Sequence, residues 1–431
     1  MRVKVAGARV IDPSEGIDGV QDLYIADGVI AASGAAPDGF APDHTINASG
    51  CIAMPGMVEL SARLREPGAE HKATIASESQ AAIANGITTL CVPPDTDPIV
   101  DTPAVVELIV RRARDVGRAH IEVIGALTHG LESQRLAEMH ALQQAGCIAV
   151  SNAGRTISNS EIMRRTMEYA ATFDLTVMTS CEDPWLSKGR YAHASANAFV
   201  AGLDPIPAAA ETIIVARDLL LAEMTGARVH FCRLSTRQSV QMLQRAQFDG
   251  LPVTADVAAH QLFLTDADLA GFDTFCHVRP PLRSRDDVVA LRAGVRDGVL
   301  SAITSDHQPH ELDAKMNPFT ETEPGISGLD TLLPLVLRLA TEESLPLSQA
   351  LATVTSGPAA IAGLERGTLS AGARADICIF DPTARRTLTP ESWWSMGKNS
   401  PFMEQTMAGT VRTTLIDGRV LYEGETAEAV A

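Results

Sequence analysis

The middle of the chain alternates apolar segments of strand length with amphipathic helical segments, and this pattern restricts the possible fold more than any other feature. The apolar segments are continuous and rich in valine and isoleucine, which is typical of strands buried on both faces of a parallel sheet. Eight such strands are predicted, at Gly56–Leu60, Ile87–Val92, Ile121–Ile124, Cys147–Val150, Thr176–Thr179, Arg228–Leu234, Pro252–Val257 and Leu300–Thr304. Helical patterns lie between most of them, for example over Ile75–Ala84, Ala104–Val116, Glu132–Ala145, Glu161–Phe173 and Ala208–Met224.

Eight strand–helix units predict an α/β fold of the TIM-like (β/α)8 barrel type, with functional groups at the C-terminal ends of the strands. An open doubly wound sheet is the structural alternative, but no G-x-G-x-x-G sequence follows an early strand. The loops 182–206 and 308–325 are long for such units. They could be lids over the active face, interaction surfaces or disordered segments.

The two ends of the chain differ from the middle, because both contain short alternating strands separated by turns. The pairs Asp27-Gly28 and Asp417-Gly418 stand between such strands and are typical of tight hairpin turns. We therefore expect one small β-sandwich module built from both termini, residues 1–53 together with 366–431. Residues 54–365 would form the barrel.

Composition excludes several classes of function. The formal charge of −18 disfavours contact with nucleic-acid phosphates. No apolar run is long enough to span a membrane, and the first residues alternate like a strand rather than forming a signal-peptide core. The seven cysteines are scattered without a C-x-x-C pair, as expected for reduced thiols in a cytoplasmic protein.

The segment Met54–Gly68 reads MPGMVELSARLREPG, an apolar strand followed by a loop that ends in Leu64-Arg65-Glu66-Pro67-Gly68. This segment resembles the dihydroorotases of the amidohydrolase superfamily. Similar blocks follow in the family's order over nearly the whole chain, at Gly86–Cys91, Thr96–Pro98, Gly202–Glu211, Leu234–Thr236, Pro280–Ser284, Ser305–His310, Gly325–Leu329 and Gly397–Phe402. One block alone is weak, but the ordered set is specific.

The resemblance implies a zinc-dependent enzyme that opens or closes a cyclic amide, with ligands spread over several strand ends. Family members carry H-x-H after strand 1, a carboxylate or modified lysine after strand 4, one histidine after each of strands 5 and 6, and an aspartate after strand 8. In this chain Asp306 retains the last of these positions. The other ligand positions hold Ser61, Arg63, Asn152, Ser180 and Arg233.

Arginine at two ligand positions makes a metal site of the ordinary kind untenable. A unit positive charge ~4 Å from a guanidinium is repelled by roughly 4 kcal/mol at an effective dielectric constant near 20, and a divalent ion by about twice that. Arginine cannot lose its proton to become a ligand. We therefore expect no metal, and Asp306 is either a surviving catalytic base or a buried carboxylate neutralised by Arg63 or Arg233.

The substrate pocket of the family is also altered. Arg65 and His310 match residues that hold the substrate carboxylate in family members, but Asp95 replaces an amide donor. Two carboxylates ~4 Å apart cost on the order of 4 kcal/mol at the same dielectric constant, which predicts weak binding of dihydroorotate. Arg279 stands where an asparagine is usual and changes the polarity of the pocket again.

A relocated metal site is a further possibility, because several histidines lie near strand ends. Each of them is more often a satisfied structural residue than a ligand, and His230 is expected to point toward the helices. Cys181 and Cys232 could be thiolate ligands, although small apolar packing is the commoner role. Neither Ser61 nor Ser180 has an evident histidine–aspartate relay in the sequence.

The resemblance implies a non-catalytic dihydroorotase homologue. Some family members are inactive subunits that associate with aspartate transcarbamoylase and support its assembly or activity in pyrimidine synthesis. We therefore expect a structural or regulatory subunit in a homo- or hetero-oligomer. The alternatives are an active cyclic-amide hydrolase with a rearranged metal site, and a small-molecule sensor that uses the pocket around Arg65 and His310.

Overall fold

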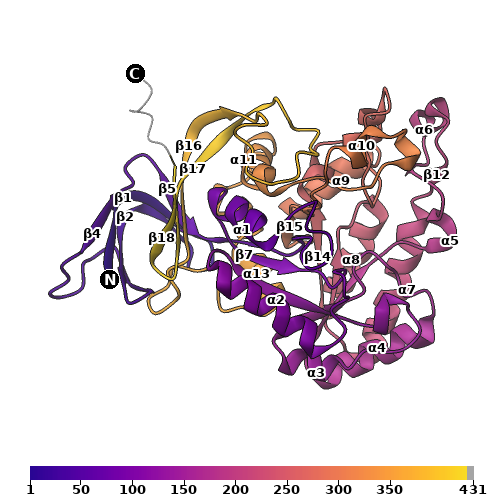
Figure 1. The fold of residues 1–431 in the computed structure, drawn as a ribbon, viewed down its shortest axis with the longest axis horizontal. Coiled ribbons are helices and arrows are strands. Elements are labelled where there is room, and N and C mark those ends of the chain that lie inside the picture. The colour runs from indigo at the N-terminus through magenta and orange to yellow at the C-terminus, as the bar shows by residue number, and fades with distance from the viewer. Residues whose placement is uncertain (425–431) are drawn as a thin grey trace.

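The computed structural model describes residues 1–424, which form a barrel of parallel strands and a separate sheet beside it (Figure 1). The barrel strands follow one another in chain order, β6 through β15, and all pair in parallel. Their bounds are β6 (Met57–Glu59), β7 (Ile87–Val92), β8 (His120–Ala126), β9 (Cys147–Ser151), β10 (Thr176–Ser180), β13 (Val229–Cys232), β14 (Val253–Ala258) and β15 (Ala302–Thr304). The predicted barrel is therefore confirmed.

The barrel closes just beyond the ends of β6 and β15. There the amide of His307 donates to the carbonyl of Ser61 at 3.0 Å, and the amide of Arg63 donates to the carbonyl of His307 at 3.0 Å. The imidazole of His307 is fixed in turn, because Glu78 lies 2.8 Å from its Nε2 and the amide of Gly328 donates to its Nδ1 at 3.1 Å. The closing seam therefore holds two residues of the candidate site, Ser61 and Arg63, in fixed positions.

Helices cover the outside of the barrel close to where the sequence predicts them. They are α1 (Ile75–Ala84), α2 (Pro103–Val116), α3 (Met139–Gln144), α4 (Ser160–Thr172), α7 (Ala209–Thr225), α8 (Arg237–Phe248), α9 (Arg285–Arg296), α11 (Leu332–Glu342), α12 (Leu347–Ala352) and α13 (Ser356–Ala362). The helix predicted over Glu132–Ala145 is wrong in its first half. Leu131 and Ser133 have φ of 54° and 60°, and a left-handed backbone cannot continue an α-helix.

The second sheet contains strands from both ends of the chain. It has the order β18-β17-β16-β5-β1-β2-β3, with β4 also paired to β1. The strands are β1 (Arg2–Asp12), β2 (Ile17–Ala26), β3 (Val29–Ser33), β4 (His44–Asn47), β5 (Ile52–Pro55), β16 (Ile377–Thr387), β17 (Thr406–Ile416) and β18 (Arg419–Glu423). Both predicted hairpins are present, and positive φ values at Asp27, Gly28, Asp417 and Gly418 give the turn shape that suits twisted strands.

Alternation along β16 explains how the sheet packs. Ile377 and Ile379 belong to the apolar core of the sheet itself, whereas Cys378 and Phe380 belong to the large apolar cluster shared with the barrel helices. Successive side chains of a strand point to opposite faces, so one strand serves both cores. Only Gly56 separates β5 of the terminal sheet from β6 of the barrel. The predicted division of the chain into two domains at residues 53/54 and 365/366 stays a prediction.

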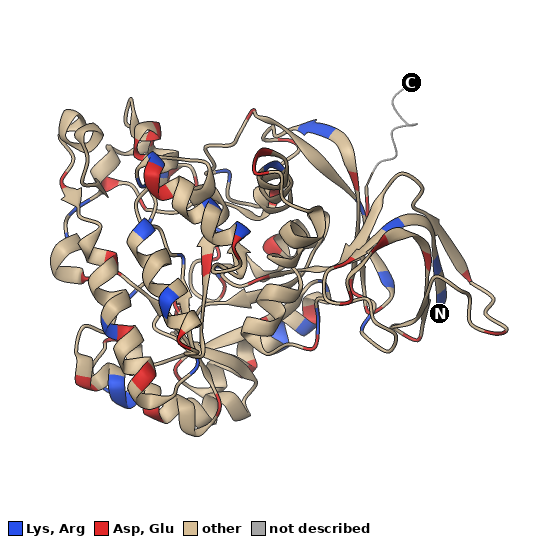
Figure 2. Ribbon diagram, turned by 180° about the vertical axis from the view of Figure 1, so that it is seen from behind, with Lys and Arg blue, Asp and Glu red and all other residues tan. Residues whose placement is uncertain are grey.

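The two long loops have elements of their own. Residues 182–206 contain α5 (Pro184–Ser187), β11 (Ala192–His193), α6 (Ala196–Ala201) and β12 (Pro205–Ile206), and residues 308–325 contain α10 (Asp313–Met316). In the view of Figure 2, acidic and basic residues are interspersed over the barrel and the terminal sheet. Within residues 1–424, none of the helices has the length and apolar character required to cross a membrane.

Gly86 lies where the barrel meets the terminal sheet and tests this packing. Its φ is +79°, and an added Cβ would lie 2.3 Å from Sγ of Cys378. Gly250 has a similar φ of +85°, but no described atom lies within 4 Å of its Cβ position. Both Gly→Ala variants incur the left-handed backbone cost, and only Gly86→Ala adds a clash. We expect Gly86→Ala to lower the free energy of unfolding by about 2 kcal/mol more than Gly250→Ala in urea titrations. Equal losses would contradict this packing.

Candidate functional site

The candidate site lies at the C-terminal ends of the barrel strands, where this fold usually holds its functional groups. Each predicted position follows or ends a strand: Ser61 and Arg63 after β6, Asp95 after β7, Asn152 after β9, Ser180 at the end of β10, Arg233 after β13 and Asp306 after β15. The structure brings most of these side chains together and turns two predicted residues, Asn152 and Arg279, to other partners.

The guanidinium of Arg233 stands at the centre of the site. Its Nη1 lies 3.3 Å from Oδ1 of Asp306 and donates to Oγ of Ser61 at 3.2 Å, while Nη2 donates to Oγ of Ser180 at 2.8 Å. Three positions that hold metal ligands in the family therefore converge on one arginine. Burial opposes the charge on Arg233, yet the carboxylate of Asp306 raises the pKa of the guanidinium above its usual range.

Arg63 bridges two acids. Its Nε donates to Oδ2 of Asp95 at 2.7 Å, and its Nη1 lies 3.6 Å from Oδ1 of Asp306. Burial would raise the pKa of Asp95, but the attraction and hydrogen bond of Arg63 outweigh it and leave that pKa below its usual value. The sequence alone predicts that Asp95 is an uncompensated charge facing a substrate carboxylate. The structure instead pairs that charge within the chain.

Asp306 is held between the two arginines. Each guanidinium contact of about 3.5 Å contributes roughly 5 kcal/mol at an effective dielectric constant near 20. That attraction is comparable to the several kcal/mol that burial of one ion costs. The other oxygen of this carboxylate, Oδ2, accepts a hydrogen bond from Nε2 of Gln308 at 2.9 Å. Both arginines point toward Asp306, as the hypothesis of arginine neutralisation requires.

Backbone conformation aims these side chains. Arg233 has φ of +55° and Asp306 has φ of +45°, so both residues leave their strands through left-handed turns. The alternation of β13 therefore stops before Arg233, and the predicted orientation of His230 is wrong. His230 lies inside the barrel, with Nε2 3.0 Å from Oδ2 of Asp256 and Nδ1 2.9 Å from Oγ1 of Thr254.

Two predicted residues point to neighbouring loops. The amide of Asn152 donates to Oγ of Ser133 at 3.2 Å and accepts from Oγ1 of Thr128 at 2.9 Å. Arg279 donates from Nη1 to Oε1 of Glu182 at 2.6 Å, which ties the 182–206 loop to the barrel. The charge of Arg279 is thus neutralised by the loop.

Arg65 and His310 lie together, as their matching positions in the family imply. Arg65 Nη2 is 3.1 Å from Nε2 of His310, and Lys72 Nζ is 3.2 Å from its Nδ1. Burial, reinforced by the charges of Arg65 and Lys72, lowers the pKa of His310 to about 2. Glu323 covers this group from the 308–325 loop, with Oε1 2.6 Å from Nζ of Lys72. Lys72 therefore already faces a carboxylate from the chain, whereas Arg65 donates to the carbonyl of Pro309 and contacts His310.

Sequence reasoning missed Glu59, Lys72, Glu182 and Gln308. Glu59 accepts from the amides of Ser61 and Ser305 at 2.7 Å each, and burial raises its pKa to about 7. The sequence does contain a signal for Glu59, because it is a carboxylate within the otherwise apolar segment Gly56–Leu60. The other three lie in loops, and no spacing in the sequence pairs them with their partners.

The space left at the site is small. A cavity of about 90 Å³ lies between Arg63, Arg65, Asp95 and the adjoining loops. Another of about 20 Å³ lies inside the barrel beside Ser61 and Arg233. Sites for small organic ligands typically enclose roughly 300–1,000 Å³. The smaller cavity could hold about one water molecule.

The zinc that the resemblance implies does not fit these residues. Zinc takes imidazole, thiolate or carboxylate donors, and among the matching positions only Asp306 supplies one at the centre of the site. Oδ1 of Asp306 faces two guanidinium groups, and the hydroxyls of Ser61 and Ser180 both accept from Arg233. A divalent ion would have to displace a paired arginine.

Two other groups of residues have metal-ligating chemistry. His230, Cys232 and Asp256 lie inside the barrel, but both nitrogens of His230 already have partners, and burial raises the pKa of the Cys232 thiol far above its usual value. His120, Asp376 and Asp417 lie at the opposite end of the barrel. The first group adjoins Arg233, because Oδ1 of Asp256 accepts from the Arg233 amide and all three residues line the cavity of about 20 Å³.

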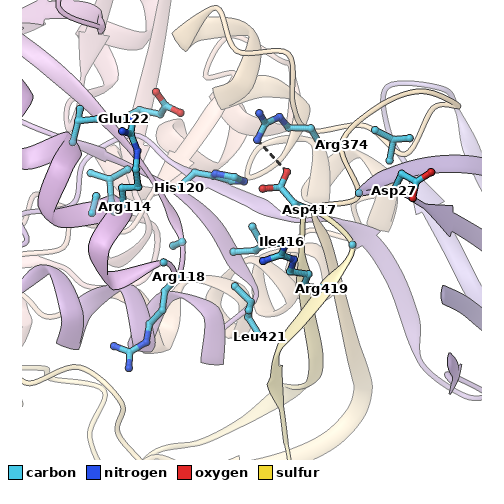
Figure 3. Close-up of a pocket in the computed structure, with 18 of the residues that line it drawn as sticks. Asp27, Arg114, Arg118, His120, Glu122, Arg374, Ile416, Asp417, Arg419 and Leu421 are labelled. Atoms are coloured by element: carbon cyan, nitrogen blue, oxygen red, sulfur yellow. Dashed lines mark hydrogen bonds and ion pairs between the residues drawn. The ribbon is translucent and has the colours of Figure 1, made fainter. Parts of the chain in front are cut away.

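Figure 3 shows the groove beside the second group, about 920 Å³ in volume, between the terminal sheet and the start of β8. Arg374 pairs with Asp417 there at 3.1 Å, and Nε2 of His120 lies 3.1 Å from Oδ2 of Asp376. Each of these acids thus lies beside a basic side chain. The groove is at the N-terminal ends of the strands, away from Asp306.

Comparisons with known proteins show the family to which the chain belongs. The family described as dihydro-orotase-like matches residues 50–239, and the amidohydrolase family matches residues 224–422. A dihydroorotase-like protein of Pseudomonas aeruginosa is 49% identical over 98% of this chain and 100% of its own length. The chain belongs to the dihydroorotase family. A dihydroorotase of Syntrophotalea carbinolica is 41% identical over 98% of this chain and 99% of its own length.

The fold is also that of solved amidohydrolases. The L-hydantoinase (dihydropyrimidinase) from Arthrobacter aurescens superposes with a TM-score of 0.87 over 98% of this chain and 97% of its own. Its sequence identity of 23% supports the fold alone. This dihydroorotase-family chain therefore shares the fold of the hydantoinase, with arginine at the centre of its site.

Asp306→Asn tests whether the carboxylate is structural. The variant leaves Arg63 and Arg233 buried without their shared counter-ion, and we expect the free energy of unfolding to fall by about 3–5 kcal/mol. Asp249→Asn is the matched control, because Asp249 pairs with Arg245 on the surface and such pairs contribute about 1 kcal/mol or less. Urea titrations would measure both. A loss of stability for Asp306→Asn no larger than for the control would overturn the structural role.

His310 predicts a dependence of stability on pH. Its folded pKa of about 2 lies below the unfolded value of about 6.5. The unfolded state therefore binds a proton that the folded state rejects, and the stability present above pH ~6.5 is lost as the pH falls, by about 1.4 kcal/mol per unit. His310→Gln should reduce this loss when unfolding is compared at neutral and mildly acidic pH. His71→Gln, at a side chain 65% exposed, should not.

Proposed function

We propose that this chain is a non-catalytic member of the dihydroorotase family that serves aspartate transcarbamoylase as a structural or regulatory subunit in pyrimidine synthesis. One observation carries the first half of the proposal. The guanidinium of Arg233 contacts Ser61, Ser180 and Asp306 at once, so it occupies the centre that a metal would need. The partner is taken from the family resemblance.

Loss of a metal would remove the chemistry of the family. Opening a cyclic amide requires a polarised carbonyl and an activated water, and a divalent ion supplies both near neutral pH. A guanidinium can donate hydrogen bonds, but it has no open coordination position for hydroxide and does not lose its proton near neutral pH. Both carboxylate oxygens of Asp306 already have partners, because Arg63 and Arg233 face Oδ1 and Gln308 donates to Oδ2.

The condition of the substrate pocket supports the same proposal. Arg65 and His310 contact each other, and Glu323 presents its own carboxylate to Lys72 beside them. The remaining cavity of about 90 Å³ is smaller than typical ligand sites. These interactions also count against a sensor that would use this pocket in the observed conformation.

The experiment mixes the purified full-length chain with an aspartate transcarbamoylase catalytic subunit from the same source. We expect one complex on size-exclusion chromatography and a change in transcarbamoylase activity or stability. The chain alone should contain substoichiometric zinc and show no turnover of dihydroorotate. Two separate elution peaks, with no effect on the transcarbamoylase, would contradict the partner role.

A second experiment tests the loss of the metal site independently of the proposed partner. A variant with Ser61→His, Arg63→His, Ser180→His and Arg233→His replaces both arginines with neutral donors around Asp306. We expect it to bind zinc where the parent chain does not. Stoichiometric zinc with dihydroorotate turnover in the parent would instead establish the active-hydrolase alternative and overturn the non-catalytic role.

A further inference from the structure

The groove of about 920 Å³ at the N-terminal ends of the barrel strands is large enough for a small organic ligand. Its walls come from the end of α2 and the start of β8, from the Asp27-Gly28 turn, and from the Asp417-Gly418 turn with the start of β18. Sites for such ligands typically enclose roughly 300–1,000 Å³. The cavities of about 90 and 20 Å³ near Asp306 are smaller, so this groove offers room that the family's usual site lacks. We call it the α2–β18 groove.

The α2–β18 groove has more basic than acidic side chains, although the whole chain is acidic. The sequence contains 53 acidic residues and 35 lysines and arginines. In the groove, four guanidinium groups face three carboxylates, from Arg114, Arg118, Arg374 and Arg419 and from Asp27, Glu122 and Asp417. Exposed charges further apart than about 8 Å are largely screened at physiological ionic strength. The local surplus of positive charge therefore decides which ions the groove attracts.

Ion pairs within the chain neutralise two of these acids. Oε1 of Glu122 lies 2.8 Å from Nη2 of Arg366, a residue outside the lining of the groove. Oδ1 of Asp417 lies 3.1 Å from Nη1 of Arg374. The surplus of positive charge thus remains after the pairs are formed.

Two guanidinium groups of the groove are available to a ligand. Arg114 and Arg419 are both exposed, and no ion pair or hydrogen bond with another group in residues 1–424 engages either guanidinium. Figure 3 shows Arg114 and Arg419 on opposite sides of His120. Arg118, by contrast, donates from Nη1 to the carbonyl of Ala76. A ligand between Arg114 and Arg419 would gain charge-assisted hydrogen bonds without breaking a pair inside the protein.

The charge of the groove favours an anion over a cation. His120, Asp376 and Asp417 have donor atoms of the kind that hold metal ions, but a cation there would be repelled by Arg374, which already contacts Asp417. The C-terminal end of α2 contributes a partial negative charge of about one half. Arg114, in the last turn of α2, carries a full positive charge that exceeds it.

We propose that the α2–β18 groove binds a small phosphorylated molecule, with its phosphate groups held by Arg114 and Arg419. A phosphate ester carries a charge of about −1.5 to −2 and three acceptor oxygens, so it can pair with more than one guanidinium. The apolar part of the lining offers contact area to an organic group, through Val110, Ile121, Ile416 and Leu421. The ligand would bridge the barrel and the terminal sheet, and would therefore stabilise the folded chain.

The proposal does not rest on the transcarbamoylase partner or on the loss of the metal site, because the groove lies at the opposite end of the barrel from Asp306. Its test uses the purified full-length chain alone. Thermal unfolding and titration calorimetry would be performed with sodium triphosphate, ATP and citrate at matched ionic strength, without divalent ions. We expect triphosphate and ATP, at low millimolar concentration, to raise the melting temperature and to release heat on binding. Tighter binding of ATP would show that the apolar lining contacts the organic part.

Substitutions locate the site. Arg114→Gln and Arg419→Gln each remove one charge-assisted contact, and we expect each to weaken triphosphate binding by about tenfold or more. Arg237→Gln is the matched control, because Arg237 is an exposed arginine on α8, outside the groove. Circular dichroism of each variant checks that the fold is intact, and if one groove variant does not fold, the other decides the question.

Three outcomes would overturn the proposal. The first is no binding of triphosphate or ATP to the parent chain. The second is binding that both groove variants retain, which would place the anion elsewhere on the protein. The third is binding of citrate without binding of either phosphate compound, which would assign the groove to carboxylates instead.

Discussion

The ion pair between Arg233 and Asp306 is the interaction on which the arrangement at the C-terminal ends of the barrel strands depends. Asp306 is 2% exposed, and a carboxylate buried that deeply needs a counter-charge. Two guanidinium groups supply the same +2 charge that one divalent ion would bring. Unlike an ion, however, they are tethered to β6 and β13 and cannot leave. The charge balance of the site is therefore part of the covalent chain and requires no metal to complete the folded structure.

Pairing of charges within the chain extends to the loops at the C-terminal ends of the barrel strands. In enzymes of this architecture, loops at the active face commonly open and close around substrate. Here Arg279 ties the 182–206 loop through Glu182, and Lys72 ties the 308–325 loop through Glu323. Two cations beside the barrel mouth thus hold loop carboxylates. The changed chemistry at the centre thus coincides with two loops that are held by ion pairs within the chain.

The sequence is informative where a residue's role follows from local pattern, and less so where it depends on distant partners. Barrel strands such as Ile87–Val92 and helix Ile75–Ala84 follow from periodicity, and both are found with the predicted bounds. The predicted orientation of His230 is wrong because the left-handed turn at Arg233 interrupts the alternation from which it follows. Asp95 has no visible partner in the sequence because Arg63 lies 32 residues away along the chain. Spacing cannot reveal such pairings.

Packing and charge pairing explain why the fold persists although the family's ligand positions have changed. The large apolar cluster joins the barrel helices to Cys378 and Phe380 of the terminal sheet, so the barrel and the sheet share one core. At the strand ends, Arg63 pairs with Asp95 and Asp306, and Arg233 pairs with Asp306. Because the charges introduced at these positions have partners within the chain, the changed strand ends remain compatible with the same barrel.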